Sequence, residues 1–162
     1  MSSTLKKIIK NSNGIALIEI IIGSAIISIG ILAINSAYNT YVEYALANQK
    51  NAEAAYLLEE GLEVMTFIRD RSWLNISRLS TTTPYYLTFG TAWATSTTPV
   101  YVDGVFLRSI NIEDVFRDAN SDIAISGTFD PEIRKITTTV SYFQGHATTT
   151  KTLSKYLANI MD

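Results

Sequence analysis

The sequence predicts an α+β fold in which one long N-terminal helix packs on a four- to five-stranded antiparallel sheet. Two observations predict the helix: an uncharged apolar run near the N-terminus, and a helical repeat of apolar residues that follows it. A third observation predicts the sheet, because after Trp73 the apolar period changes towards two. We therefore expect the helix at 15–75 and a β-rich head at 76–162, within a chain of 162 residues that suits one modest domain.

The apolar run predicts a helix that crosses a membrane. From Ile20 to Val42 the chain has 23 residues without a formal charge, and a helix of that length spans a hydrocarbon core of about 30 Å. Lys6, Lys7 and Lys10 precede the run, and such lysines favour the cytoplasmic side. The sequence thus predicts a single-pass protein of the cytoplasmic membrane, with its span at about 15–42 and its C-terminal head outside.

The second part of the helix is predicted to be amphipathic. Its apolar stripe has steps of four and three, and carboxylates lie away from it. The stripe comprises Ala54, Leu58, Gly61, Met65 and Ile68. Since no proline occurs before Pro84, one helix can run from about Ile15 to about Trp73, roughly 90 Å long. The alternative is two helices joined near Asn48. Gly61 lies on the stripe, where its missing side chain would admit a close neighbour.

The head is predicted to be an antiparallel sheet, because its segments are rich in β-branched and aromatic residues and are separated by turn signals. The expected strands are Tyr85 to Phe89, Val100 to Ile112, Ile123 to Phe129, Ile133 to Phe143 and Thr148 to Leu157. The turn signals are Asp103-Gly104, Asn120-Ser121, Asp130-Pro131 and Gln144-Gly145. The last of these predicts a hairpin between the final two strands.

Composition excludes several functions. Without residues 1–14 the chain has ten basic and fifteen acidic residues and no basic stripe, which argues against a dedicated nucleic-acid binder. The chain has no cysteine, so thiolate metal sites and cysteine nucleophiles are excluded. His146 is the only histidine, and no phosphate-binding loop or nucleophile elbow occurs. We therefore assign no catalysis and no cofactor.

One acidic segment is a weak calcium candidate. Asp118, Asn120 and Asp122 place oxygen side chains at alternate positions, as the opening of a calcium loop does. The pattern then departs from an EF-hand, since Ile123 stands where glycine is needed and Phe129 where a bidentate glutamate is needed. A solvated turn is therefore the preferred interpretation, and no metal site is assigned.

The junction before the apolar run carries the most specific signal. Gly14 is followed by the apolar Ile15 and, four residues later, by Glu19. This pattern resembles the prepilin peptidase site of type IV pilins and pseudopilins, with Ile15 where that family usually has Phe or Met. The resemblance implies that residues 1–14 form a basic leader removed after Gly14, and that Ile15 becomes an N-methylated terminus. It also implies that Glu19 pairs with the new amino group of a neighbouring subunit or of its own chain.

The resemblance implies a structural subunit of a type IV pilus or pseudopilus, and the Glu60-Gly61 and Arg69-Asp70 region is similar to that of some minor pilins. Its partners would be other pilin subunits, prepilin peptidase, the assembly platform of the inner membrane and the membrane itself. After assembly the subunit would be located in a cell-surface filament or a periplasmic pseudopilus. Two alternatives remain: a pseudopilin of a type II secretion or DNA-uptake system, with nucleic acid as partner only in the latter, and a non-polymerising, membrane-anchored binding domain.

Overall fold

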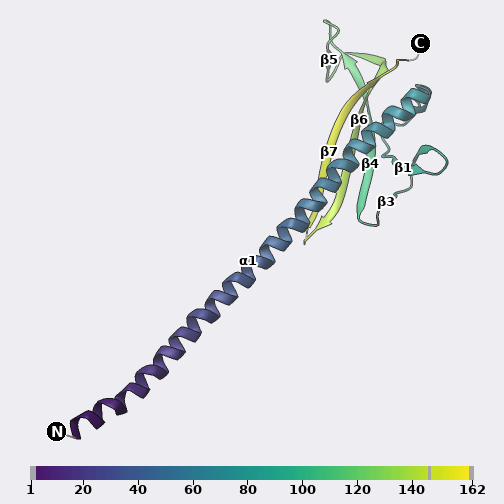
Figure 1. The fold of residues 1–162 in the computed structure, drawn as a ribbon. Coiled ribbons are helices and arrows are strands. Elements are labelled where there is room, and N and C mark those ends of the chain that lie inside the picture. The colour runs from purple at the N-terminus through teal and green to yellow at the C-terminus, as the bar shows by residue number, and fades with distance from the viewer. Residues whose placement is uncertain (1–2, 146, 161–162) are drawn as a thin grey trace. The chain divides into compact units, whose positions relative to one another are not determined.

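The computed structural model describes residues 3–145 and 147–160, with side chains from residue 14 onward. The chain forms two compact units, 1–48 and 49–162. Helix α1 is Ser3–Arg71 and helix α2 is Leu74–Ser77. The strands are β1 Tyr86–Phe89, β2 Trp93–Ser96, β3 Tyr101–Val102, β4 Phe106–Arg117, β5 Ile123–Ala124, β6 Thr128–Gln144 and β7 Ala147–Ala158 (Figure 1). The predicted α+β fold is confirmed.

Helix α1 contains both predicted helical parts. It passes through Asn48 without interruption, so the alternative of two helices joined near that residue is wrong. It ends at Arg71, two residues before the expected end, and the chain then forms the short helix α2. Arg69 and Arg71 lie in the last turn of α1, where positive charge interacts favourably with the helix dipole.

The main sheet is antiparallel and has the strand order β3-β4-β6-β7, with β5 paired to β4. The predicted number of four to five strands is confirmed, although the predicted strand from Tyr85 to Phe89 is not among the five. The predicted hairpin is also confirmed, because Gln144 pairs with Ala147 and Gly145 has a φ of 62°. The predicted strand from Tyr85 to Phe89 forms β1, which pairs in a separate hairpin with β2, a strand that the sequence did not predict. A bridge from Tyr85 to Ile110 joins this region to β4.

Three strand predictions need correction. The segment from Ile123 to Phe129 is not one strand, because β5 ends at Ala124, Gly127 has a φ of 148° and β6 begins at Thr128. The segment from Val100 to Ile112 is not one strand, because it turns at Asp103 and Gly104, whose φ values are 51° and 68°. It therefore forms β3 and the first half of β4. This turn signal was recognised in the sequence but was placed inside a strand.

The predicted turn at Asp130-Pro131 is wrong, because both residues lie within β6. Here the register shifts: Val115 of β4 pairs with Asp130, and the preceding Asp114 pairs with Arg134. The extra residues of β6 form a bulge, and a bulge is one of the few places where a strand accepts proline. Asp130 and Pro131 thus lie at a bulge within one long strand and do not end it.

The core of the second unit lies between α1 and the sheet (Figure 1). Alternate residues of β4 and β6 point towards α1, and this alternation follows from the pleat of a strand. One cluster joins Leu62, Val64, Met65 and Ile68 of α1 to Ile76, Leu87, Ile110, Ile112, Ile136 and Leu157. A second joins Ala54 and Leu58 to Phe106, Val140 and Tyr142.

Gly61 allows α1 to approach the sheet closely, as its place on the apolar stripe predicted. A Cβ atom at this position would lie 2.7 Å from Cγ2 and 3.0 Å from Oγ1 of Thr138, which is fully buried in β6. The first distance is shorter than real Cβ contacts, and the second is tighter than most of them. The absence of a side chain at Gly61 therefore sets the distance between helix and strand.

Candidate functional site

Gly14 and Ile15, the predicted cleavage residues, lie inside α1. Both are exposed, with Ile15 exposed to 68%, and a Cβ added at Gly14 would meet no atom within 4 Å. No packing therefore holds a side chain against this part of the helix. A substitution at Gly14 would add a side chain without a clash inside the chain.

Glu19 lies one helical turn after Ile15 and is also exposed. Residues four apart share a helix face, and the rise between them is about 6 Å. The backbone nitrogen of Ile15 and the carboxylate of Glu19 are thus neighbours along one face. Glu19 stands between Ile18 and Ile20, which are 59% and 68% exposed. A carboxylate on such an apolar surface costs up to about 3 kcal/mol deep in a bilayer, and less near its edge.

The helix surface after Glu19 is apolar on all sides. Its large side chains are more than half exposed, and they comprise Ile20, Ile21, Ile22, Ile26, Ile27, Ile29, Ile31, Leu32 and Ile34. Among the described residues, the part of α1 from Gly14 onward is the one helix long and apolar enough to cross a membrane, with a mean hydropathy of 2.5 in a window of which nothing is buried. This surface is compatible with a single-pass membrane anchor.

Small residues interrupt this apolar surface. Gly23 and Gly30 are seven residues apart and thus lie on nearly the same helix face, and an added Cβ would meet nothing within 4 Å at either position. The hydroxyls of Ser24 and Ser28 donate to the carbonyls of Ile21 and Ser24, at 2.9 and 2.8 Å. The serines therefore need no external acceptor. Such a surface lets another helix approach closely in an apolar medium.

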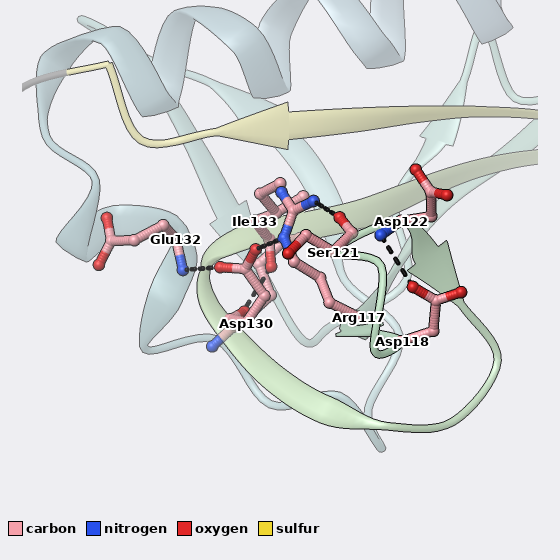
Figure 2. Close-up of polar contacts among 8 residues, drawn as sticks. Arg117, Asp118, Ser121, Asp122, Asp130, Glu132 and Ile133 are labelled. Carbon is pink, nitrogen blue, oxygen red and sulfur yellow. Dashed lines mark hydrogen bonds and ion pairs between the residues drawn. The ribbon is translucent and has the colours of Figure 1, made fainter.

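The calcium candidate residues form a tight turn between β4 and β5. The Oδ1 atom of Asp118 accepts hydrogen bonds from the backbone nitrogens of Asn120 and Asp122, at 2.8 and 3.0 Å. Figure 2 shows the carboxylates of Asp118 and Asp122 pointing in different directions. Within the described ranges, no group of three or more acidic or histidine side chains is arranged to hold a metal. The carboxylate of Asp118 thus stabilises the turn.

An ion pair ties this turn to the β6 bulge (Figure 2). Nε of Arg117 donates to Oδ2 of Asp130 at 2.6 Å, and Nη1 of Arg117 donates to the carbonyl of Ser121 at 2.5 Å. The backbone nitrogen of Glu132 donates to the other carboxylate oxygen of Asp130 at 2.9 Å. The hydrogen bond from Arg117, followed by that from Glu132, lowers the pKa of Asp130 below its ordinary value of 3.8.

The sequence reasoning missed two buried arginines. Arg108 is 3% exposed and pairs with Glu60 of α1, while Arg134 is 7% exposed and lies 3.5 Å from Asp114. The burial of Arg108 could have been predicted from the alternation of buried and accessible residues in β4, because Arg108 lies two residues after the buried Phe106. The one histidine, His146, lies outside the described residues.

Comparison with protein-family models, with curated proteins and with solved structures finds no match to this chain. The fold and the exposed helix define a coarse class, an α+β head that follows an apolar helix able to span a membrane. The predicted cleavage residues Gly14 and Ile15 lie five and four residues before Glu19 in α1, whereas Asp118, Asn120 and Asp122 form a separate turn in the head.

Proposed function

We propose that this chain is a structural subunit of a type IV pilus or related pseudopilus, processed after Gly14 and polymerised through the N-terminal part of α1. One observation carries the proposal: the Gly14-Ile15 junction and Glu19 stand at the start of the part of α1 whose apolar surface is exposed on all sides. Such a surface needs an apolar environment. Lipid would provide it before assembly, and the helices of neighbouring subunits would provide it in the filament.

Processing requires that a helical peptide bond become accessible to a peptidase. The four residues before the junction, Asn11 to Gly14, have poor helix propensity, and each costs about 0.5–1 kcal/mol relative to alanine. Local unwinding is therefore cheaper here than in the Ile-rich segment that follows. Because Gly14 has no side chain and no close neighbour, the peptidase would meet little steric hindrance.

Assembly requires a partner for Glu19. In a packed filament the carboxylate would be removed from water, and a buried carboxylate without a partner is strongly unfavourable. Cleavage creates a positive amino group on Ile15, and methylation would leave that charge in place. The amino group of one subunit can then pair with Glu19 of its neighbour or of its own chain. An intermolecular pair would set the axial register between subunits.

This proposal gives each region a role. The head would lie outside the cytoplasmic membrane, and the partners would be other subunits, prepilin peptidase and the inner-membrane assembly platform. The same features would serve a pseudopilin of a secretion or DNA-uptake system. A non-polymerising anchored domain, in contrast, would keep its original N-terminus.

The test compares Gly14→Val with Gly23→Val in cells that contain prepilin peptidase. Neither substitution creates a clash within the chain, because an added Cβ meets nothing within 4 Å at either glycine. We expect the wild type and Gly23→Val to reach mature size, and Gly14→Val to remain a precursor, as measured by gel mobility and intact mass. Mature-size Gly14→Val protein would show that the cleavage site is misassigned.

A further inference from the structure

The main sheet has a second face, which α1 does not cover. Residues that pair directly across an antiparallel ladder point to the same side, so the register assigns each side chain to a face. Among the residues of β4, β6 and β7 that point away from α1, three adjacent rows carry no charge. They are Leu107-Ser141-Thr150, Ser109-Thr139-Thr152 and Asn111-Thr137-Ser154. We call these nine residues the hydroxyl face.

The hydroxyl face is accessible and ordered by its own contacts. Its members are half-buried or exposed, whereas the residues that alternate with them on β4 and β6 are buried against α1. Thr137 and Ser154 share a hydrogen bond of 2.9 Å, and Ser141 and Thr150 share one of 3.0 Å. Each hydroxyl can donate one hydrogen bond and accept two, so these contacts leave capacity for a ligand.

The hydroxyl face carries no formal charge. At one end, Glu113 and Lys135 lie 3.1 Å apart and neutralise each other. Lys151 and Lys155 of β7 point to the other side, because they pair with Val140 and Ile136, which are buried against α1. Among the residues described, an anionic ligand would therefore find on this side of the three strands only Lys135, whose charge Glu113 neutralises. The chemistry favours a neutral ligand rich in hydroxyl groups.

Aromatic rings lie around the edge of the face. Tyr101, Phe143 and Tyr156 are 58%, 59% and 49% exposed. They pair with Leu107, Thr148 and Lys135, so all three point away from α1. An aromatic ring offers an apolar surface on which the C–H face of a sugar ring can pack, while nearby polar groups fix its orientation.

We propose that the hydroxyl face binds the surface of a neutral polysaccharide. A second copy of this chain fits the face less well, because sheets that stack on each other do so through apolar inner faces. The proposal requires that the head lie outside the cell membrane. It does not require cleavage at Gly14 or filament assembly, so each idea can fail while the other stands.

The experiment measures co-sedimentation of the full chain with insoluble chitin and cellulose, with silica particles as the non-sugar control. A zwitterionic detergent keeps the chain soluble without introducing a competing sugar headgroup. We expect the protein to sediment with at least one of the two polysaccharides and not with silica. Failure to bind either polysaccharide would overturn the proposal.

Paired variants locate the binding surface. Thr139→Val with Thr152→Val removes two hydroxyls from the central row and keeps their shape, and we expect a roughly ten- to thirtyfold weaker affinity for the polysaccharide. Thr149→Val is the matched control, because Thr149 lies in β7 but pairs with the buried Tyr142 on the other side. Unchanged binding by the double variant, with circular dichroism showing an intact fold, would contradict the proposal.

The aromatic contribution is tested separately. We expect Phe143→Ala to weaken binding and Tyr56→Ala to leave it unchanged, since Tyr56 is 71% exposed but lies on α1. Analytical ultracentrifugation of the same proteins tests for a second copy on the face. Self-association that the Thr139 and Thr152 substitutions abolish, without any polysaccharide binding, would assign the face to another subunit and overturn the proposal.

Discussion

The two parts of α1 have similar apolar residues in opposite environments. In the unit that ends at Asn48, Ile26 is 65% exposed, whereas in the unit that begins at Gln49, Met65 is fully buried beneath the sheet. The first part is apolar on all sides, while the second confines its large buried side chains to one face. Residue pattern, more than hydrophobic content, thus decides which part packs on the head.

The largest difference between the two parts is expected from truncating one apolar residue in each. Met65→Ala should lower the free energy of unfolding of the head by about 2–5 kcal/mol, because it leaves a cavity in the core. Ile26→Ala should change it by less than about 0.5 kcal/mol. Urea unfolding in detergent, followed by the fluorescence of Trp73 and Trp93, measures both. Equal losses would show that the head depends on the first part of α1.

The buried ion pair gives the next largest effect. Glu60→Ala leaves the charge of Arg108 buried without its carboxylate, which should cost about 2 kcal/mol. This value lies below that of a fully buried pair, because the Glu60 side chain is 43% exposed. Glu59→Ala, the adjacent exposed control, should have little effect in the same unfolding experiment. If both variants lost the same stability, the pair would not hold α1 on the sheet.

Two alanine substitutions at glycine sharpen the contrast. Gly61→Ala should destabilise the head by about 1–2 kcal/mol, because the clash with Thr138 outweighs the gain in helix propensity. Gly30→Ala, with nothing within 4 Å of its Cβ, should not destabilise the head. Combining Gly61→Ala with Thr138→Ala should recover part of the loss, as shown by the urea midpoint. A Gly61→Ala protein as stable as the wild type would refute the close approach.

The smallest effect is expected at the far end of the head, where acid should weaken the contact between Asp130 and Arg117. The pKa of Asp130 is lowered in the fold, so its contribution is fully present above its ordinary pKa of 3.8. That contribution is lost as the pH falls through the lower, folded value. Asp130→Asn should therefore be less stable at pH 7 and should respond less to pH below 4. Asp103→Asn, an exposed turn control, should keep the pH response of the wild type.

Much of the fold was predictable because it depends on local pattern. The long helix, the β6–β7 hairpin at Gly145 and the close approach at Gly61 all follow from periodicity, turn residues or a missing side chain. The bulge at Pro131 was not predictable, because a turn signal does not reveal whether a strand continues beyond it. Strand β1 was predicted from Tyr85 to Phe89, whereas β2, which is only four residues long, was missed together with its pairing to β1.

The candidate sites also differ in how far they could be predicted from local sequence. Gly14, Ile15 and Glu19 are close in sequence, so a helix alone places them on one short segment. The pair of Arg108 and Glu60, in contrast, joins residues 48 positions apart and depends on how α1 crosses β4. The hydroxyl face likewise required the register of three strands, although its threonine clusters were visible in the sequence.

Mass spectrometry of the N-terminus of the protein from its native membrane tests the proposed function most directly. The account predicts a chain that begins at Ile15, carries one methyl group on its amino nitrogen and lacks residues 1–14. A chain that begins at or near Met1 would contradict processing after Gly14 and would favour a non-polymerising membrane-anchored domain.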